Sequence, residues 1–520
     1  MRRIGIDVGG TNTDAVLIDG ARILQAVKTT TTEDVLGGIR TALEQLLADA
    51  RDSAATVGLA AVVIGTTHFT NAVIERKHLQ RVGALRIGLP ASASLPPFID
   101  WPEDLAALVR GVVHMVEGGH EYDGRPIVPL DGAAVRDAAR RMADAGIGSV
   151  GITSVFSPLT AECEQEAERI VREELPGASI TLSRDLGRIG LLERENVTLL
   201  NACLQALARR ATEAFTEALR QSGIEAPLYL TQNDGTIMRA ELARRFPVYS
   251  FASGPTNSMR GAAFLSGLDD GVVVDVGGTT TDIGYLKSGF PREANAAVEI
   301  GGVRTLFRMP DLLSIGLGGG TEVAPDGSRI GPRSVGFRLL RKGLAFGGDT
   351  LTASDIAIAA GRLDLGERSR VAGLSPDFVG GMLARMGEMV AEGVDRMKTE
   401  AGDLPLLAVG GGSFLIPDQV EGCSAVVRVP HHAVANAVGA AIAQASGEVD
   451  QVFSGLSRDA AIAAAQTEAE RRAVEAGAAR DTLKMVEMED IPLSYLPGDA
   501  RRVRVRMIGD IDAGRTEAAA

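Results

Sequence analysis

The chain has 520 residues, of which 45% are hydrophobic, so we expect two or more domains with an ample apolar core. Its formal net charge of −14 argues against nucleic acid or an anionic membrane as the main partner and favours a small-molecule substrate. Asp7 interrupts the N-terminal apolar stretch, and no run approaches the roughly 18 apolar residues of a membrane span, so we expect a soluble, cytoplasmic protein. Three widely spaced cysteines, Cys163, Cys203 and Cys423, predict free thiols.

One short motif occurs twice in the chain. Residues 7–14 and residues 275–282 are identical at seven of eight positions, and each copy follows an apolar run typical of a buried strand. Each copy predicts a β-hairpin whose glycine-rich tip exposes backbone N–H groups, hydroxyls and a carboxylate, which suits phosphate and its metal. A single copy is compatible with an ordinary hairpin. The repeat predicts two related halves that clamp a polyphosphate between them.

The first part of the chain alternates between strand and helix patterns. Two further strands of a meander are predicted at residues 15–18 and 23–28, followed by a helix over residues 33–50. A strand over residues 60–64 leads into a polar loop that ends at Asn71, and a helix begins near Ala72. Residues 91–130 are rich in proline and glycine and predict an insertion of strands and loops, with His120 on its surface.

The middle of the chain continues this alternation. Helices are predicted over residues 131–145 and 161–174, strands over 81–88, 149–153 and 179–182, and a long helix over 191–222 that is expected to bridge the halves. A strand over residues 228–231 leads into a polar turn, Gln232 to Gly235. Ser253 is expected near the cap of a helix over residues 256–265, whose N-terminus is either an anion site or an ordinary capped end.

Two glycine clusters follow the second hairpin motif. The first lies at residues 316–320, and the second, residues 410–412, ends a strand at 406–409 where a flat adenine or ribose would fit against the backbone. The adjacent histidines 431 and 432 lack a Cys/His/Asp cluster, so we expect no transition-metal site there. A helix over 457–477 and strands over 484–489 and 503–508 predict a small docking appendage, with disorder from about residue 513.

Two phosphate hairpins and a later glycine-rich strand end match the plan of the actin, sugar-kinase and heat-shock-70 superfamily, in which ATP lies between two halves. The order of the motifs more closely resembles the hydantoinase A / 5-oxoprolinase family, from residue 1 to about 445. The matching motifs are residues 7–14, 65–72, 253–255, 275–282 and 315–320. The resemblance implies an α/β fold with two duplicated ribonuclease-H-like domains, residues 1–188 and 189–447, around an ATP cleft, and a C-terminal appendage, residues 448–520.

The resemblance also implies an activity. Members open a cyclic amide, such as a hydantoin, oxoproline or a related lactam, after ATP phosphorylates the amide oxygen, which makes the carbon easier for water to attack. ATP and Mg²⁺ are the expected cofactors, and a separate B-type subunit and an oligomeric assembly are the expected partners. Three alternatives remain: a nucleotide-binding subunit of an acetone-type carboxylase, a small-molecule kinase, and a non-catalytic ATP-switching subunit.

The resemblance assigns roles to individual residues. Asp7 and Asp275 are expected to be catalytic and to hold Mg²⁺, and His68, Asn71 and Asp234, which follow strand ends, are expected to contact the substrate. The residues expected to bind the nucleotide are Gly9, Gly10, Thr11, Asn12, Thr13, Asp14, Gly277, Gly278, Thr279, Thr280, Thr281, Asp282, Gly318, Gly319, Gly410, Gly411, Gly412 and Ser413.

The chain also departs from the family pattern. Only about 70 residues follow Ala445, whereas long members carry a large additional C-terminal region. The cysteine-containing segment of the long members is replaced around residues 331–355. The chain therefore resembles a short hydantoinase A form, and the identity of its substrate and its need for a B-type subunit stay open.

Overall fold

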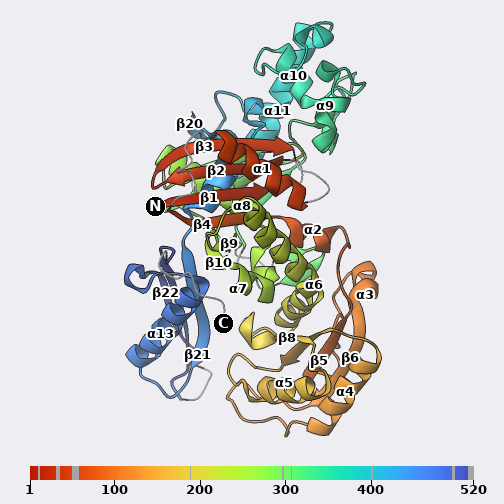
Figure 1. The fold of residues 1–520 in the computed structure, drawn as a ribbon, viewed down its shortest axis with the longest axis vertical. Helices are drawn as coiled ribbons and strands as arrows, with labels where there is room; N and C mark the ends of the chain where they lie inside the picture. The colour runs from red at the N-terminus through yellow and green to blue at the C-terminus, as the bar shows by residue number, and fades with distance from the viewer. Residues whose placement is uncertain are drawn as a thin grey trace.

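The computed structural model describes residues 1–9, 12–30, 35–49, 58–187, 189–294, 298–305, 307, 309–399, 402–494 and 498–512. The predictions for Gly10, Thr11 and the residues from 513 onward lie outside this part of the chain. Two large sheets and a separate four-stranded sheet form the framework, and helices pack around them (Figure 1).

The two halves share one strand order, which confirms the predicted duplication. In each, a three-stranded antiparallel meander is joined through its first strand to two parallel strands. The first half has the order β3-β2-β1-β4-β9, with β1 (Arg2–Val8), β2 (Asn12–Asp19), β3 (Arg22–Thr30), β4 (Leu59–Thr66) and β9 (Leu228–Thr231). The second half has the order β13-β12-β11-β19-β20, with β11 (Gly271–Val276), β12 (Thr281–Lys287), β13 (Phe290–Pro291), β19 (Leu404–Val409) and β20 (Cys423–Arg428).

Residues 82–182 form an α/β unit of their own, called the insertion below, which is larger than the predicted insertion at residues 91–130. Its four parallel strands have the order β6-β5-β7-β8, with β5 (Val82–Leu89), β6 (Arg110–Glu117), β7 (Ser149–Ser154) and β8 (Ser179–Leu182). Helix α4 (Gly132–Asp144) packs on α5 (Glu162–Glu174) and buries Val135, Ala138, Ala139 and Met142, which recur at helical spacing along one face. The Asp131 side chain accepts from the N–H of Ala134 (2.9 Å) and caps α4.

The sequence predicts that helix α6 (Leu191–Gln221) bridges the two halves. In the structure, most of its contacts are instead with the insertion and the first half. It packs against β7 and β8 of the insertion on one side and against α1 (Val35–Asp49) and α7 (Ala240–Arg245) of the first half on the other, and it also contacts β15 (Val303–Thr305) of the second half. The long helix therefore joins the insertion to the first half. Other helices are α2 (His68–Ile74), α3 (Glu103–Val109), α9 (Leu339–Lys342), α10 (Ala353–Ala359) and α11 (Pro376–Met397).

The C-terminal strands extend the sheet of the first half. Strand β10 (Ile237–Arg239) pairs with β21 (Ala445–Phe453), which pairs with β23 (Arg501–Gly509) and through it with β22 (Lys484–Pro492), so the first-half sheet has nine strands. Helix α13 (Arg458–Ala476) covers this extension with a row of fully buried alanines. These small side chains let the helix approach so closely that a Cβ at Gly447 would lie 2.1 Å from the carbonyl oxygen of Ala469.

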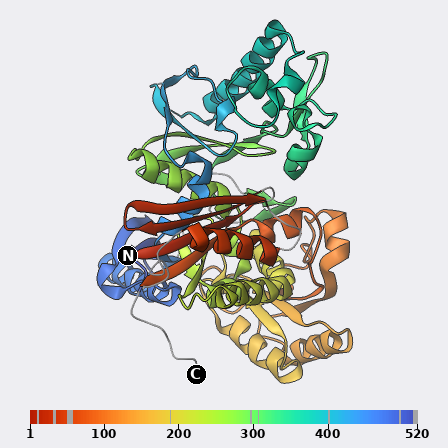
Figure 2. The same cartoon turned by 45° about the horizontal axis from the view of Figure 1, so that its top comes forward.

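Helices α8 (Ser253–Ser266) and α12 (Ala435–Ile442) form the central helix pair (Figure 2). A Cβ at Gly261 would lie 1.9 Å from the carbonyl oxygen of Ala435, and a Cβ at Gly439 would lie 1.8 Å from that of Asn257. Backbone oxygens cannot move aside, so both contacts require glycine. No helix among the described residues combines the length and apolarity needed to cross a bilayer.

We predict that Gly439→Ala lowers the free energy of unfolding by about 1–3 kcal/mol, because the added methyl group must push α8 and α12 apart. Thermal unfolding followed by circular dichroism measures the effect. The matched control is Gly381→Ala on the exposed face of α11, where a Cβ meets nothing within 4 Å and alanine should stabilise by about 1 kcal/mol. Equal changes in the two variants would contradict the close contact.

Candidate functional site

The two repeated motifs fold into matching hairpins, and each places its carboxylates on facing strands. Asp7 lies opposite Asp14 across β1 and β2, and Asp275 lies opposite Asp282 across β11 and β12. The same backbone hydrogen bond joins the ends of each hairpin tip. The Gly9 N–H donates to the Asn12 carbonyl at 3.0 Å, and the Gly277 N–H donates to the Thr280 carbonyl at 2.9 Å.

Burial changes the ionisation of both leading carboxylates. Asp7 is only 4% exposed, and burial, with a smaller effect of the Asp14 charge, raises its pKa to about 7. The carboxylate of Asp275, in the other half, also raises the pKa of Asp7. Burial raises the pKa of Asp275 to about 6, against a hydrogen bond from Ser258 that lowers it. The two halves therefore direct negative charge toward one region.

Lys28 on β3 supplies positive charge to this region. Its ammonium lies 2.5 and 2.7 Å from the two carboxylate oxygens of Asp14, and its charge lowers the pKa of both Asp7 and Asp275. The Lys28 side chain also reaches the second half, since a Cβ at Gly411 would lie 3.4 Å from its Cε. The sequence pattern did not single out Lys28, because its role depends on the register of β2 and β3 and on the approach of the second half.

Two buried oxygen atoms near Asp7 lack a hydrogen-bond partner. Asn436 of α12 donates to Oδ2 of Asp7 at 2.8 Å, but among the described residues nothing donates to Oδ1 of Asp7 or to Oδ1 of Asn257 on α8. Both side chains flank Gly65, whose Cβ would lie 2.6 Å from Asp7 Oδ1 and 2.5 Å from Asn257 Nδ2. Buried oxygens without partners are costly unless a ligand satisfies them, and Mg²⁺ prefers such hard oxygen donors.

These oxygens fit a cation that is shared with a phosphate ligand. In the described part of the chain no group of three His, Cys, Asp or Glu side chains is arranged to hold a metal by itself. Mg²⁺ usually binds through one or two carboxylates together with waters and phosphate oxygens, so the donor set around Asp7 and Asp275 is compatible with it.

The first glycine cluster supports the second hairpin. The N–H groups of Gly319 and Gly320 donate to the carbonyls of Gly277 (3.0 Å) and Gly278 (2.7 Å) at the hairpin tip. A Cβ at Gly318 would lie 2.6 Å from the backbone nitrogen of Thr279, so the tip leaves no room for a side chain there. The cluster therefore lies against the predicted phosphate loop.

The second glycine cluster also packs on this hairpin. A Cβ at Gly410 would lie 2.2 Å from Oδ1 of Asp275, and the Gly412 N–H donates to the Val276 carbonyl at 2.7 Å. Ser413 is 5% exposed at the start of a short 3₁₀ turn. Close approach to Asp275 thus explains the glycine at 410, and contact of this strand end with a base stays a prediction.

The three predicted substrate residues do not come together. His68 and Asn71 lie in helix α2, which begins at His68, so the prediction of a loop up to Asn71 is wrong. The His68 ring stacks on His78 at 6.5 Å between centroids, and Asn71 donates to the Thr67 hydroxyl at 3.2 Å. Burial, assisted by His78, lowers the pKa of His68. Asp234 lies elsewhere, with its carboxylate bound to Thr236 and Arg506.

Two further local predictions need correction. His120 is only 3% exposed, not a surface residue, because the insertion folds around it, and its Nδ1 lies 4.0 Å from the Cys163 sulfur. Ser253 is the first residue of α8 instead of its cap, since Ala252 before it takes a left-handed conformation. The α8 N-terminus does lie beside the first hairpin, because a Cβ at Gly254 would lie 4.0 Å from Asp7 Oδ1.

Comparison with known protein families matches most of the chain. Residues 3–175 match the hydantoinase/oxoprolinase N-terminal region, and residues 194–370 match the hydantoinase/oxoprolinase domain that follows it. The chain belongs to the hydantoinase/oxoprolinase family. This membership agrees with the motif order and with the paired hairpins, and it covers the Asp7 and Asp275 motifs together.

Individual relatives place the chain within this family. The caprolactamase alpha subunit of Pseudomonas jessenii is 26% identical over 79% of this chain, and the acetone carboxylase beta subunit of Xanthobacter autotrophicus is 25% identical over 69%. The chain spans 65% and 54% of the lengths of these two relatives.

Solved structures share the fold. The ATP-dependent caprolactamase from Pseudomonas jessenii superimposes with a TM-score of 0.78 at 21% identity, over 98% of this chain and 88% of that one. Nucleotide-free acetone carboxylase superimposes with a TM-score of 0.70 at 18% identity, over 99% and 89%. The hydantoinase/oxoprolinase architecture therefore extends through the C-terminal strands.

The raised pKa of Asp7 predicts a pH-dependent stability. Because the folded protein holds this proton up to about pH 7, whereas an unfolded aspartate loses it near 3.8, the free energy of unfolding falls as the pH rises between these values. In the wild-type protein, deprotonation of Asp7 should lower the free energy of unfolding by roughly 3 kcal/mol between about pH 5 and pH 8. Asp7→Asn should abolish this part of the pH dependence. Thermal midpoints at both pH values test this, with the exposed Asp349→Asn as control. An unchanged pH dependence in Asp7→Asn would contradict the prediction.

Proposed function

We propose that this protein opens a cyclic amide, such as a hydantoin, oxoproline or a related lactam, in an ATP-dependent reaction, with the nucleotide phosphates held between the two hairpins. One observation carries the proposal: two matching hairpins from different halves direct the buried carboxylates Asp7 and Asp275 toward one region. Membership in the hydantoinase/oxoprolinase family supports this reaction over others that use the same superfamily fold.

The chemistry explains why ATP is needed. An amide carbonyl is stabilised by resonance, and its nitrogen is a poor leaving group, so direct attack by water is slow. In the proposed reaction the amide oxygen attacks the γ-phosphorus, the bond from phosphorus to the ADP oxygen breaks, and the amide N–H proton is lost. Water then adds to the activated carbon and the ring nitrogen leaves as a protonated amine. A second water releases inorganic phosphate from the acyl phosphate that remains.

The residues of the hairpins position the phosphates. The protein's contribution to phosphoryl transfer is mainly orientation and charge stabilisation. The tip residues Gly9 to Thr13 and Gly277 to Thr281 are proposed to bind phosphate through backbone N–H groups and hydroxyls, and Lys28 to offset the added negative charge. Asp7 and Asp275 would hold Mg²⁺, which would neutralise charge on the phosphates. The pKa of each carboxyl lies near 6 or 7, so metal binding should strengthen as the pH rises.

The two relatives are named as subunits, the caprolactamase alpha subunit and the acetone carboxylase beta subunit. This supports a partner subunit for this chain as well. We therefore propose that a B-type subunit completes the reaction, and that ATP turnover by the chain alone is slow. ATP turnover measured with and without the co-encoded B-type protein tests this part of the proposal.

Turnover of ATP with a panel of cyclic amides tests the function. We expect ring opening coupled to release of ADP and inorganic phosphate, and a loss of at least about 100-fold in kcat/KM for Asp7→Ala and for Asp275→Ala. The control variant is Asp349→Ala, an exposed carboxylate far along the chain from both hairpins. Unchanged turnover in both hairpin variants would refute the phosphate clamp.

The products distinguish the alternatives. A stable phosphorylated product would identify a small-molecule kinase, and bicarbonate-dependent carboxylation would identify a carboxylase subunit. ATP turnover that no cyclic amide changes, with or without the B-type protein, would identify an ATP-switching subunit. Each of these results would replace the amide-opening function.

A further inference from the structure

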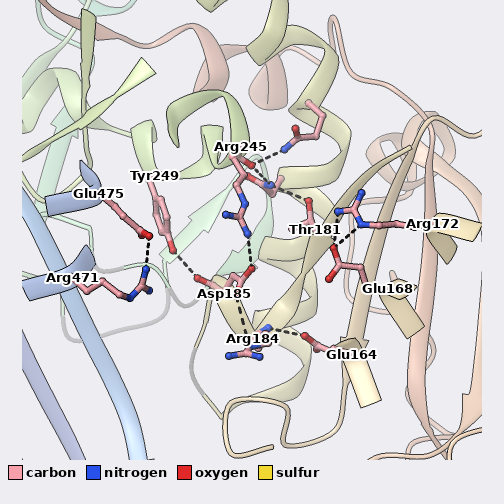
Figure 3. Close-up of polar contacts among 12 residues, drawn as sticks. Glu164, Glu168, Arg172, Thr181, Arg184, Asp185, Arg245, Tyr249, Arg471 and Glu475 are labelled. Carbon is pink, nitrogen blue, oxygen red and sulfur yellow. Dashed lines mark hydrogen bonds and ion pairs between the residues drawn. The ribbon is translucent and has the colours of Figure 1, made fainter. Parts of the chain in front are cut away.

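A cavity of about 360 Å³ lies where the first half, the insertion and the C-terminal strands meet. It is lined by Arg184, Asp185 and Leu186 after β8, by the turn after β9, by Tyr249, and by parts of β21 and α13 (Figure 3). This volume falls in the range of small-molecule sites. Of the residues predicted above to contact the substrate, Asp234 lines the cavity.

Asn233 presents an unused amide to this cavity. The residue is 7% exposed, and its backbone is fixed by hydrogen bonds from its N–H to the Tyr249 carbonyl (2.7 Å) and from the Thr256 hydroxyl to its carbonyl (3.0 Å). Its side-chain amide has no hydrogen-bond partner among the described residues, yet lines the cavity. Because this amide faces the cavity from a fixed backbone and has no partner among the described residues, its donor and acceptor are available to a ligand.

The neighbouring Asp234 is already occupied. One of its carboxylate oxygens accepts from the N–H and the hydroxyl of Thr236, and the other accepts from Arg506 at 2.9 Å. The third polar side chain of this turn, Gln232, donates to the Thr236 hydroxyl and the Ile237 carbonyl, so Asn233 is the one whose side chain makes no hydrogen bond to a described residue.

The walls of the cavity combine aromatic rings with internally paired charges. Tyr249 packs against Phe246 and Phe307, with ring centroids 5.6 and 6.1 Å away, and its hydroxyl donates to the Asp185 carbonyl at 3.0 Å. Each arginine of the rim already faces a carboxylate: Arg184 and Arg245 face Asp185, Arg471 faces Glu475, and Arg472 faces Glu468. Paired charges around an apolar wall favour an uncharged ring over an anion.

We propose that this cavity binds a neutral cyclic amide as the substrate of the proposed reaction and that Asn233 pairs with its amide edge. Ring closure forces the amide into the cis form, which places N–H and C=O on the same edge. The Asn side chain offers an acceptor and a donor in one plane and can pair with both groups. A linear secondary amide is trans and presents these groups on opposite edges, so it can form only one of the two bonds. This inference rests on the proposed function.

One wall of the cavity, the turn after β9, lies at the same edge of the sheet as the first hairpin. Strands β1, β4 and β9 are parallel neighbours, and their carboxyl ends carry Asp7, Gly65 and Thr231. The Thr231 hydroxyl lies 3.3 Å from the Cβ position of Gly65, and Asp7 Oδ1 lies 2.6 Å from the same point. With strands spaced at about 4.8 Å, the turn that holds Asn233 begins roughly 10 Å from Asp7.

Binding of small amides to the full-length protein tests the proposal. Calorimetry measures the affinity for 2-pyrrolidinone, δ-valerolactam, ε-caprolactam and hydantoin, with N-methylacetamide as the trans amide, δ-valerolactone as the ring without N–H, and 5-oxoproline as the charged ring. We expect at least one neutral cyclic amide to bind more tightly than all three comparison compounds. Asn233→Leu and Asn233→Asp should each weaken that binding by about 10- to 100-fold, because leucine loses both hydrogen bonds and aspartate replaces the donor to the lactam carbonyl with a repelling oxygen.

The control variant is Gln221→Ala, which removes an exposed amide at the end of α6 and should leave the affinity unchanged. The proposal is overturned if no cyclic amide of the panel binds, if both Asn233 variants keep the wild-type affinity, or if they lower kcat while KM for the amide stays constant. A cyclic amide that binds through Asn233 without changing ATP turnover would support the cavity and refute the proposed function. Ring opening in which the Asn233 variants keep the wild-type KM for the amide would support the proposed function and refute the cavity as the amide site.

Discussion

The structure depends on the burial of like charges at the meeting point of two duplicated hairpins. Asp7, Asp14, Asp275 and Asp282 all have raised pKa values because burial disfavours their charged forms. The Lys28 charge lowers the pKa of Asp7, Asp14 and Asp275, and a hydrogen bond from Asn436 lowers that of Asp7 and Asp14. Such an arrangement is costly in the protein alone, and strain or unpaired charge of this kind concentrates at functional sites. A bound cation would convert the repulsion into attraction.

The central helix pair explains how this arrangement is held together. Asn436 on α12 reaches Asp7 at a separation of 429 residues, while Asn257 and Ser258 on α8 lie beside Asp7 and Asp275 respectively. These contacts require α8 and α12 to pack at backbone distance, which Gly261 and Gly439 permit. The glycines of the helix pair thus position the amides that surround the carboxylates.

Local patterns predicted most of the elements but not their long-range partners. The repeated motif, the alternation in residues 131–182 and the long helix α6 were predictable, since periodicity and turn chemistry act over a few residues. The start of α2 at His68, the burial of His120 and the packing of α6 on the insertion depend on contacts between distant segments. The same holds for Lys28, Asn436 and Asn233, whose surroundings come from strand register and helix packing that spacing in the sequence does not encode.

The nine-stranded sheet makes the first half discontinuous in the chain. Four of its strands, β1 to β4, lie within the first 66 residues, but β21 and β23 come from residues 445–509, and Arg3 donates to the Ala443 carbonyl across this gap at 3.2 Å. During synthesis, β10 therefore keeps an open edge until nearly the whole polypeptide has been made. Contacts of such large sequence separation slow folding and expose unpaired strands. The insertion, whose four strands are contiguous in sequence, can complete its sheet long before the half that carries it.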